Sequence, residues 1–438
     1  MLPTREDLAW IRRFRLSIVR DIPRLQEICR AELDRPEFET LMSDIVPLLD
    51  ACRWHEKHAR GALKPKRIKH GGIWRMGQHH TLTRRPLGHV AIIATWNYPY
   101  NLLGTQLVQA IAAGNRVTVK PSERSPLAHG ALLSLAREAG LDENRLMATE
   151  PTRDAGRHLL EFGQFDHVLF TGSTNVGRSI ASTLAQSLTP STLELSGADS
   201  AIVLDDADVR LAAESVYFAF SMNAGQSCMA PRRVIVEAGA YDRFVAALSP
   251  LVNQSYQQRR VDEREADRLR AMIQQASSQG SVVSVGEMPS SGATVAPAAL
   301  ECPPDSEIAT GEHFAPAIAV LKSESRTQTK TLARASMKSL TVSVFTKSPS
   351  QARAITQDLD AGFVTINDCM LPTAHPGVSI GGRGLSGWGV SQGELGLLAM
   401  TRPQFVSRTS SRFRVPTRPP SQRVQKNMNR FVRWWYGR

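Results

Sequence analysis

One pattern restricts the fold more than any other feature of the sequence: a short run rich in apolar residues, a turn and then a helical stretch. The runs lie at residues 90–95, 116–120 and 167–170. Helical stretches follow at 101–113 and 125–139, and a third begins near Gly177. A continuous apolar run is typical of a strand buried on both faces. Its repetition with helices predicts a doubly wound parallel sheet, on which ligands bind at the carboxyl ends of the strands.

A second strand–helix series follows Glu194. Its predicted strands are 201–204, 233–236, 341–345 and 362–366, and its predicted helices are 210–220, 241–251, 261–280 and 350–359. Residues 1–70 are predicted to be mostly helical, with apolar residues at helical spacing between Phe38 and Cys52. Residues 289–304 are rich in Ser, Gly, Ala and Pro and are predicted to be loop. The last stretch, 408–438, is predicted to be loose until Asn427.

Length and composition indicate a globular protein of two or three domains. A chain of 438 residues is too long for one simple core, and 42% hydrophobic with 21% charged residues is ordinary for a soluble protein. No signal peptide is visible, and no apolar run approaches the length of a membrane span. The five cysteines are odd in number and far apart, so they predict neither a disulfide framework nor a metal site. A reducing, cytoplasmic setting fits.

The positive charge is concentrated at the C-terminal end. Residues 402–438 contain nine arginines and one lysine without Asp or Glu, so they supply +10 of the net charge of +12. The basic pI therefore describes a tail, and we expect no nucleic-acid partner for the main body.

A cysteine lies among small and polar residues between Ser221 and Arg233. Gly225 lets the backbone bend or approach another segment closely, and Pro231 has no N–H for a helix or a ladder. A substrate carbonyl could reach Cys228 on such a turn, and sulfur is a strong nucleophile even when only partly ionised. The stretch predicts a covalent catalyst, and a buried structural cysteine is the alternative that this stretch alone leaves open.

Three further segments place candidate site residues at the ends of predicted strands. Gly172-Ser173 opens a helix, where N–H groups could hold a phosphate or where Ser173 is a plain N-cap. Lys120 and Glu123 follow a strand, and the carboxylate suits sugar hydroxyls unless this is a solvated loop. Glu194 lies between two leucines, so burial would raise its pKa and make it a general base near neutral pH. The alternative for Glu194 is an ordinary ion pair.

Residues 382–387 match Gly-x-Gly-x-x-Gly, but no βαβ unit surrounds them. We interpret this segment as a flexible loop and not as a dinucleotide fingerprint.

Taken together, seven segments resemble the aldehyde dehydrogenase family. They are Trp96-Asn97-Tyr98-Pro99, Lys120-Pro121-Ser122-Glu123, Phe170-Thr171-Gly172-Ser173, Glu194-Leu195-Ser196-Gly197, Gly225-Gln226-Ser227-Cys228, Glu312-His313-Phe314-Ala315-Pro316 and Ser386-Gly387. Each segment alone is weak, but their order and approximate spacing agree from about residue 86 to residue 406. The short N-terminal part resembles the compact, class-3-like branch of the family.

The resemblance implies a role for each catalytic candidate. Cys228 would attack the aldehyde carbon, while the side chain of Asn97 and the backbone N–H of Cys228 would hold the oxyanion. Hydride transfer would leave a thioester, and Glu194 would activate the water that hydrolyses it to a carboxylic acid.

The resemblance also implies NAD as the cofactor, with NADP as the alternative. The residues implied to contact it are Lys120 and Glu123 at the adenine ribose, Gly172 and Ser173 near the pyrophosphate, Glu312 at the nicotinamide ribose, and Phe314 and Trp96 near the ring. A carboxylate at position 123 would repel a 2′-phosphate, which favours NAD.

The implied fold is α/β with a Rossmann-type cofactor domain, an α/β catalytic domain and a small bridging element. The implied segments are 1–78 and 87–196 for NAD binding, 197–385 for catalysis, 79–86 and 402–410 for bridging strands and 411–438 for a basic tail. The implied partners are a small aldehyde and a second subunit in a homodimer. For the aromatic and basic tail we weigh a weak contact with a membrane surface against a solvated extension that packs on the partner subunit.

Some residues depart from the family pattern. Ser196 and Ala315 replace glycines, and Ala198 replaces a lysine, so loop geometry near Glu194 and Glu312 could shift. Two alternative functions stay open. One is an enzyme that passes the acyl group to coenzyme A, against which Glu194 speaks, and the other is a catalytically weak scaffold protein whose basic tail binds membranes or anions.

Overall fold

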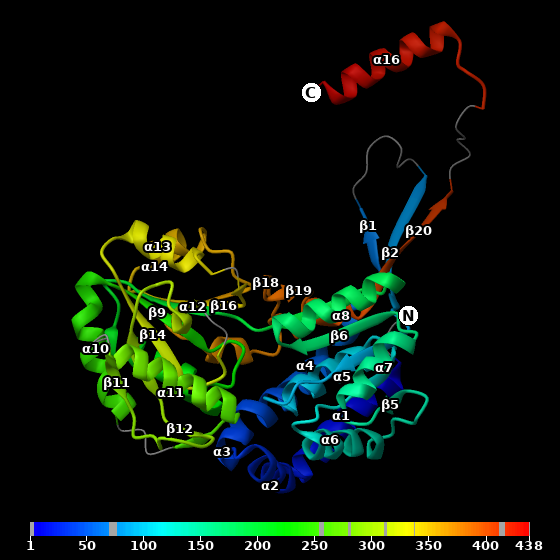
Figure 1. The fold of residues 1–438 in the computed structure, drawn as a ribbon. Coiled ribbons are helices and arrows are strands. Elements are labelled where there is room, and N and C mark those ends of the chain that lie inside the picture. The colour runs from blue at the N-terminus through cyan, green and yellow to red at the C-terminus, as the bar shows by residue number, and fades with distance from the viewer. Residues whose placement is uncertain are drawn as a thin grey trace. The chain divides into compact units, whose positions relative to one another are not determined.

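The computed structural model describes residues 4–69, 77–253, 258–278, 282–310, 313–336, 338–410 and 417–437. Contacts group the chain into two units (Figure 1): Met1–Lys64 with Arg84–Arg402, and Pro65–Thr83 with Pro403–Arg438. The described residues 65–69, 77 and 78 belong to the smaller unit, and the assignment of residues 1–78 to a cofactor domain stays a prediction. The division of the larger unit into a cofactor-binding and a catalytic domain stays a prediction.

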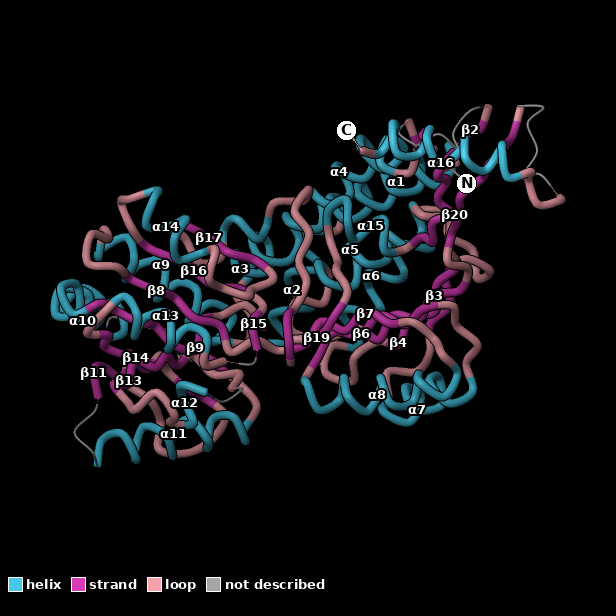
Figure 2. Tube along the Cα trace, turned by 90° about the horizontal axis from the view of Figure 1, so that it is seen from above, coloured by secondary structure: helices cyan, strands magenta, loops and turns pink. Residues whose placement is uncertain are grey.

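The first sheet of the larger unit is the parallel sheet that the repeated pattern predicts. In the described part of the chain it has the order β19-β7-β6-β3-β4-β5, and only β19 is antiparallel to its neighbour. Its strands are β3 (His89–Ile93), β4 (Arg116–Lys120), β5 (Leu146–Ala148), β6 (His167–Gly172), β7 (Ser191–Leu195) and β19 (Gly387–Trp388). Its helices are α5 (Asn101–Ala112), α6 (Pro126–Glu138), α7 (Arg153–Phe162) and α8 (Thr174–Ser187). Figure 2 shows α7 and α8 on one face and α5 and α6 on the other.

The second sheet is built by the later strand–helix series, as predicted. Among the described residues its order is β11-β13-β14-β9-β8-β16-β17, with only β11 antiparallel. Its strands are β8 (Asp199–Val203), β9 (Pro231–Glu237), β11 (Val282–Val285), β13 (Ala298–Glu301), β14 (Ala317–Ser323), β16 (Thr341–Phe345) and β17 (Phe363–Ile366). Its helices are α9 (Val209–Ser221), α10 (Ala238–Asn253), α11 (Glu263–Ser278), α12 (Glu307–Thr310), α13 (Arg326–Arg334) and α14 (Pro349–Thr356).

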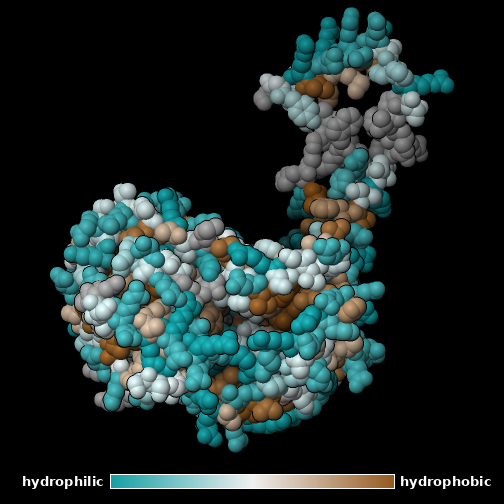
Figure 3. Space-filling model, viewed as in Figure 1, coloured by the Kyte–Doolittle hydropathy of each residue, from teal (hydrophilic) through white to brown (hydrophobic). Residues whose placement is uncertain are grey.

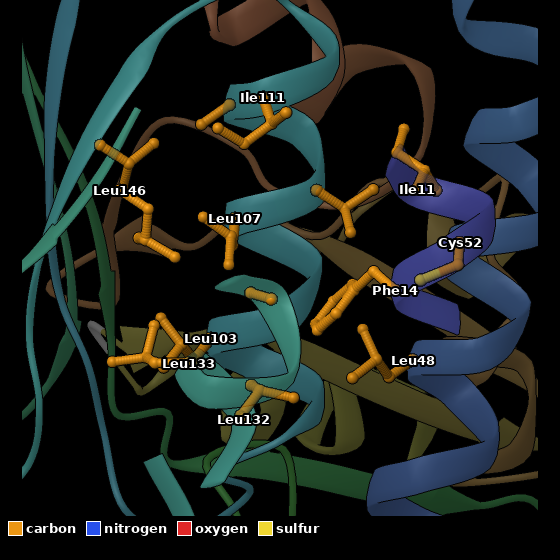
Figure 4. Packing of buried hydrophobic residues seen from close by; sticks show 14 of the residues in the cluster. Ile11, Phe14, Leu48, Cys52, Leu103, Leu107, Ile111, Leu132, Leu133 and Leu146 are labelled. Carbon is orange, nitrogen blue, oxygen red and sulfur yellow. The ribbon is translucent and has the colours of Figure 1, made fainter. Parts of the chain in front are cut away.

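An apolar core joins the N-terminal helices to the first sheet. These helices are α1 (Arg5–Arg20), α2 (Ile22–Leu33), α3 (Glu37–Thr40), the π-helical turn Leu41–Ile45 and α4 (Val46–Ala62), which confirms the helical prediction for this part. Phe14 of α1 and Leu48 of α4 point toward each other beside α5, whose Leu107 lies on the side of the sheet (Figure 4). Phe38 does not join this core, because it is 74% exposed.

Two predictions of irregular structure, for residues 289–304 and for the tail, are wrong, and a third, for residues 382–387, is wrong in part. Residues 289–304 contain β12 (Thr294–Val295) and β13, and β13 lies buried between β11 and β14. Small residues and nearby prolines give this strand a loop-like composition although its backbone completes the sheet. The tail also becomes regular earlier than expected, since α16 (Gln422–Tyr436) begins well before Asn427.

The smaller unit contains a three-stranded sheet and α16. The strands, in the order β1-β2-β20, are β1 (Lys66–Ile68), β2 (Gln78–Pro86) and β20 (Thr401–Thr409). Thr83 donates to the Gln404 carbonyl at 3.0 Å, which pairs segments far apart in the sequence. The segments predicted as strands at 79–86 and 402–410 thus match β2 and β20, and their bridging role stays a prediction.

The remaining short elements of the described chain are β10 (Arg259–Arg260), β15 (Lys338–Ser339), β18 (Arg383–Gly384), α15 (Gly393–Ala399) and the 3₁₀ turns Met222–Gly225 and Leu371–Ala374. The Gly-x-Gly-x-x-Gly segment 382–387 carries β18 and the start of β19, which pair with β15 and β7. The segment is therefore partly paired, with β18 in a two-stranded sheet of its own and Gly387 at the edge of the first sheet, and is not simply the loop that we predicted.

Candidate active site

The turn before Cys228 has a strained backbone. Asn223, Ala224 and Gly225 have φ of 52°, 54° and 73°, in the left-handed region that non-glycine residues rarely adopt. A Cβ added at Gly225 would lie 2.3 Å from the carbonyl oxygen of Ala315, so only glycine fits this close approach. Such strain persists only where surrounding groups hold the backbone, and two buried arginines do so here.

Arg35 holds the turn from the side of the N-terminal helices. Its fully buried guanidinium donates to Oδ1 of Asn223 at 3.1 Å, to the carbonyl of Asn97, and to Oδ2 of Asp44 at 3.2 Å. Burial raises the pKa of Asp44 to about 6, while the charge of Arg35 opposes that rise. One planar side chain therefore fixes the turn relative to the segment that carries Asn97. No motif pointed to Arg35, which lies 188 residues before Asn223.

Arg232 holds the turn from the opposite end. It donates to the carbonyls of Gly225 at 3.0 Å, Ser227 at 2.8 Å and Ala315 at 3.4 Å. Its side chain is buried, and burial lowers the pKa of the guanidinium to about 10, so it stays charged at neutral pH. The sequence contains this residue in the Cys228 segment, but its partners became visible only in the fold.

Asn97 lies beside the turn that precedes Cys228. Its Nδ2 donates to the carbonyl of Gln226 at 3.0 Å, and its own carbonyl accepts from Nδ2 of Asn223 at 3.0 Å. Asn97 is only 3% exposed. A primary amide has two N–H groups, and the bond to Gln226 uses one of them.

The thiol of Cys228 is half-buried at the end of this turn. Burial, together with the negative charges of Glu194 and Asp199, raises its pKa to about 12. The thiol is therefore protonated at neutral pH, and an attack by sulfur needs a base to take the proton.

Glu194 lies on β7, paired with Gly387 of β19. Burial raises the pKa of its carboxyl group to about 7, and a hydrogen bond with Ser391 opposes the rise. Its Oε1 atom is buried and has no hydrogen-bond partner among the described residues. A carboxylate with this pKa and a vacant acceptor can take a proton near neutral pH.

Asp199, which the sequence analysis did not select, is a second carboxylate near the thiol. It begins β8, and burial raises its pKa to about 7. It accepts from the backbone N–H of Leu340 at 2.9 Å and from the hydroxyl of Thr341 at 3.0 Å. These bonds tie Asp199 to the neighbouring strand β16. Its position at the start of an apolar run was the only signal in the sequence.

Lys120 and Glu123 meet at the carboxyl end of β4. Nζ of Lys120 lies 2.7 Å from Oε2 of Glu123, and Arg153 of α7 donates to the other oxygen at 3.3 Å. Burial would raise the pKa of Glu123, but these hydrogen bonds outweigh it and lower the pKa to about 2. The pair thus presents a permanent carboxylate and an ammonium group together.

The other cofactor candidates lie around neighbouring strand ends. Gly172 ends β6, and Ser173 caps α8 by accepting from the N–H of Val176 at 3.5 Å. The rings of Trp96 and Phe314 lie 6.4 Å apart. Glu312 lies outside the described residues.

The residues that depart from the family pattern are accommodated in buried positions. The carbonyl of Ser196 accepts from the hydroxyl of Ser386 at 3.1 Å, which links the end of β7 to the 382–387 segment. Ala315 is fully buried and still lets Arg232 reach its carbonyl. Ala198 is 2% exposed.

A large cavity reaches Cys228. Its volume is about 760 Å³, and Cys228 and Met222 line it together with Tyr98. Most of its wall is apolar. Phe38 and Leu371 also line the cavity, and because their side chains are 74% and 75% exposed they lie at its mouth. Its charged lining residues, Glu39 and Arg259, form an ion pair at 2.9 Å.

Comparisons with known proteins match most of this chain. The sequence model of the aldehyde dehydrogenase family matches residues 2–406. The "Probable coniferyl aldehyde dehydrogenase" of Pseudomonas aeruginosa is 30% identical over 380 residues, covering 84% of this chain and 79% of that protein. The "4,4'-diapolycopene-4,4'-dial dehydrogenase" of Cytobacillus firmus is 29% identical over 379 residues, covering 85% and 83%. A solved aldehyde dehydrogenase of Mycobacterium tuberculosis complexed with NAD+ has a TM-score of 0.85 and 26% identity, covering 94% of this chain and 87% of that one.

Proposed function

The chain belongs to the aldehyde dehydrogenase family, and from that premise we propose that it oxidises an aldehyde to a carboxylic acid with NAD, or alternatively NADP, as acceptor. The observation that carries the proposal is the proximity of three side chains: Cys228, which an apolar cavity reaches, Asn97, which donates to the carbonyl of Gln226, and Glu194, whose charge acts on the Cys228 thiol. The three residues come from three separate parts of the chain. A thiol, an amide and a carboxylate are the groups that addition to an aldehyde and hydrolysis of a thioester require.

The first step is addition of the Cys228 sulfur to the aldehyde carbon. The S–C bond forms, the carbonyl π electrons move to oxygen, and the thiol proton leaves. Glu194 takes this proton, because its Oε1 has a vacant acceptor site and its pKa is about 7, whereas Asp199 already accepts two hydrogen bonds. The second N–H of Asn97 and the backbone N–H of Cys228 hold the oxyanion, and each such donor is typically worth ~3–4 kcal/mol.

The second half of the reaction is hydrolysis. Once hydride has left the carbon, a thioester remains on Cys228. Glu194 first releases the thiol proton to solvent and then accepts a proton from water as the new C–O bond forms. The C–S bond then breaks, which releases the acid, and the Cys228 sulfur takes back a proton from Glu194. A water-activating carboxylate would be superfluous in an enzyme that passes the acyl group to coenzyme A, so Glu194 favours hydrolysis.

The strand ends around the site fit a dinucleotide. Lys120 and Glu123 offer a cation and a carboxylate to ribose hydroxyls, and Ser173 opens α8, where backbone N–H groups attract phosphate. The rings of Trp96 and Phe314 offer an apolar wall. When bound there, NAD supplies the acceptor for the hydride. The fully ionised carboxylate of Glu123 disfavours a 2′-phosphate, and therefore NADP.

The cavity supports a large apolar or aromatic aldehyde as substrate. Its wall near Cys228 is formed mainly by apolar side chains such as Leu102, Phe218 and Met222, and its charged lining residues neutralise each other. The relatives from P. aeruginosa and C. firmus bear names of an aromatic and a long polyene aldehyde. Small hydrophilic aldehydes would leave most of the apolar wall in contact with water.

We also propose a homodimer and a cytoplasmic location. β20 is an edge strand of its sheet, and its Phe405 and Val406 are exposed, so the edge suits pairing with a second copy. All five cysteines are described, and all are free, which fits a reducing compartment. Light scattering of the purified protein tests the dimer.

The function is tested by following NADH formation with a panel of aldehydes, from acetaldehyde to long apolar and aromatic ones. We expect turnover with NAD, higher kcat/KM for the apolar aldehydes, and no dependence on coenzyme A. Dependence on coenzyme A would establish the acylating alternative. Binding of NAD without oxidation of any aldehyde would favour the scaffold alternative.

A further inference from the structure

The helix α16 has two chemically different faces and is exposed along its described length. The apolar residues Val424, Met428, Phe431, Val432 and Trp435 follow helical spacing on one side. The basic residues Arg423, Lys426, Arg430 and Arg433 lie on the other side. Figure 3 shows the same division, with teal side chains on one side of the helix and brown and tan ones on the opposite side. None of these side chains is buried.

An exposed apolar stripe of this kind needs a partner. An isolated helix of 15 residues is only marginally stable in water. Keeping large aromatic side chains exposed to water also costs free energy. Phe431, Trp434 and Trp435 are 44%, 52% and 48% exposed. Their ring centres lie about 6 Å from one another, so they form one aromatic cluster.

The charge of the tail indicates which partner fits. Residues 402–438 carry +10 and no acidic residue, so the tail attracts anionic partners and repels cationic ones. A second copy of the chain does not supply one, because the remainder of the chain carries +2 and every tail is equally basic. No described helix is long and apolar enough to cross a bilayer, so α16 can only lie along a membrane surface.

We propose that α16 binds the surface of an anionic lipid bilayer. Phe431, Val432 and Trp435 enter the boundary between headgroups and acyl chains, where Trp and Tyr are favoured. Arg423, Lys426 and Arg430 contact lipid phosphates by their long side chains. The proposal goes beyond the enzyme activity and does not depend on it.

The test is vesicle flotation of the full-length protein. Vesicles contain phosphatidylcholine alone or with phosphatidylglycerol, at low and high salt. We expect binding only to the anionic vesicles and weaker binding at high salt. Removing four charges from the helix should weaken binding by about 10³-fold, because each cation near the surface contributes ~1 kcal/mol. This charge variant is Arg423→Gln, Lys426→Gln, Arg430→Gln and Arg433→Gln.

Two further variants separate the possible outcomes. A control removes the same number of exposed charges from the larger unit: Arg12→Gln, Arg60→Gln, Arg210→Gln and Arg264→Gln. It should bind vesicles like the parent protein, while Phe431→Ser with Trp435→Ser should bind weakly at any salt. Both α16 variants should keep the parent's rate of aldehyde oxidation without vesicles.

Three results would overturn the proposal. One is equal binding to both kinds of vesicle or to neither. Another is an equal loss of binding in the control. The third is a change of oligomeric state in the Phe431→Ser, Trp435→Ser protein without lipid, because the apolar stripe would then cover a second subunit.

Discussion

Replacing Glu194 with glutamine should remove the pH dependence of hydrolysis. The replacement keeps the shape of the side chain and removes its ability to accept a proton. Burial raises the pKa of Glu194 to about 7, because a buried carboxylate loses hydration when it is charged. The active, deprotonated form therefore increases as pH rises through 7, whereas an unperturbed glutamate with a pKa near ~4.3 would give a flat rate in this range.

The pKa fixes the size of the effect. With a pKa of about 7, the deprotonated fraction is roughly 0.09 at pH 6 and roughly 0.91 at pH 8, so the rate of the parent should rise about tenfold. In Glu194→Gln the steady-state rate should fall by about 10²–10⁴-fold, the usual contribution of a general base. A first turnover should survive, because bulk base can slowly remove the thiol proton, and a thioester should accumulate.

The assay is stopped-flow measurement of NADH between pH 6 and pH 8.5. Asp199→Asn is the matched control, because Asp199 is also near Cys228 and has a pKa of about 7. Asparagine can still accept from the N–H of Leu340 through its oxygen, and its amide N–H can donate to the hydroxyl of Thr341, so we expect this variant to keep the rise with pH. The reasoning is refuted if Glu194→Gln keeps the same pH profile, or if Asp199→Asn loses it while remaining folded.

Three other substitutions test the surroundings of the thiol. Arg35→Met should lower the free energy of unfolding by about 3–5 kcal/mol, because Asp44 and the Cys228 turn lose their shared partner. It should also lower kcat more than it changes KM for NAD, and an unchanged kcat would contradict this. Gly225→Ala should cost about 2–4 kcal/mol in thermal unfolding, because of its positive φ and the contact with Ala315, whereas Gly130→Ala in an open part of α6 should not destabilise. Glu123→Gln should increase kcat/KM for NADP relative to NAD, and an unchanged ratio would argue against Glu123 at the ribose.

The order of strands and helices was predictable because each depends on a local pattern. Arg116–Lys120 is a strand over the predicted residues, and the predicted helix 101–113 ends within one residue of α5. The strand β13 was missed because Ala298 and Ala299 carry little strand preference, and its position is stabilised by pairing with β14. Local composition cannot reveal a strand that tertiary pairing determines.

The candidate site was predictable where the residues stand in motifs, and not where they act from a distance. Cys228, Glu194 and Asn97 were selected because they stand in motif segments. In the fold, Asn97 donates to the carbonyl of Gln226, two positions before the cysteine. Arg35 lies in the N-terminal helical region, so only the folded chain shows that it holds the turn. Asp199 was missed because a carboxylate at the start of a strand acquires its raised pKa only through burial.

The central claim, that Cys228 forms the covalent intermediate, is tested most directly by mass spectrometry of Glu194→Gln after mixing with NAD and an apolar aldehyde. The account predicts one acyl group per chain, located on the peptide that contains Cys228 and absent from Cys228→Ala. An acyl group on Cys29, Cys52, Cys302 or Cys369, or continued turnover by Cys228→Ala, would contradict it.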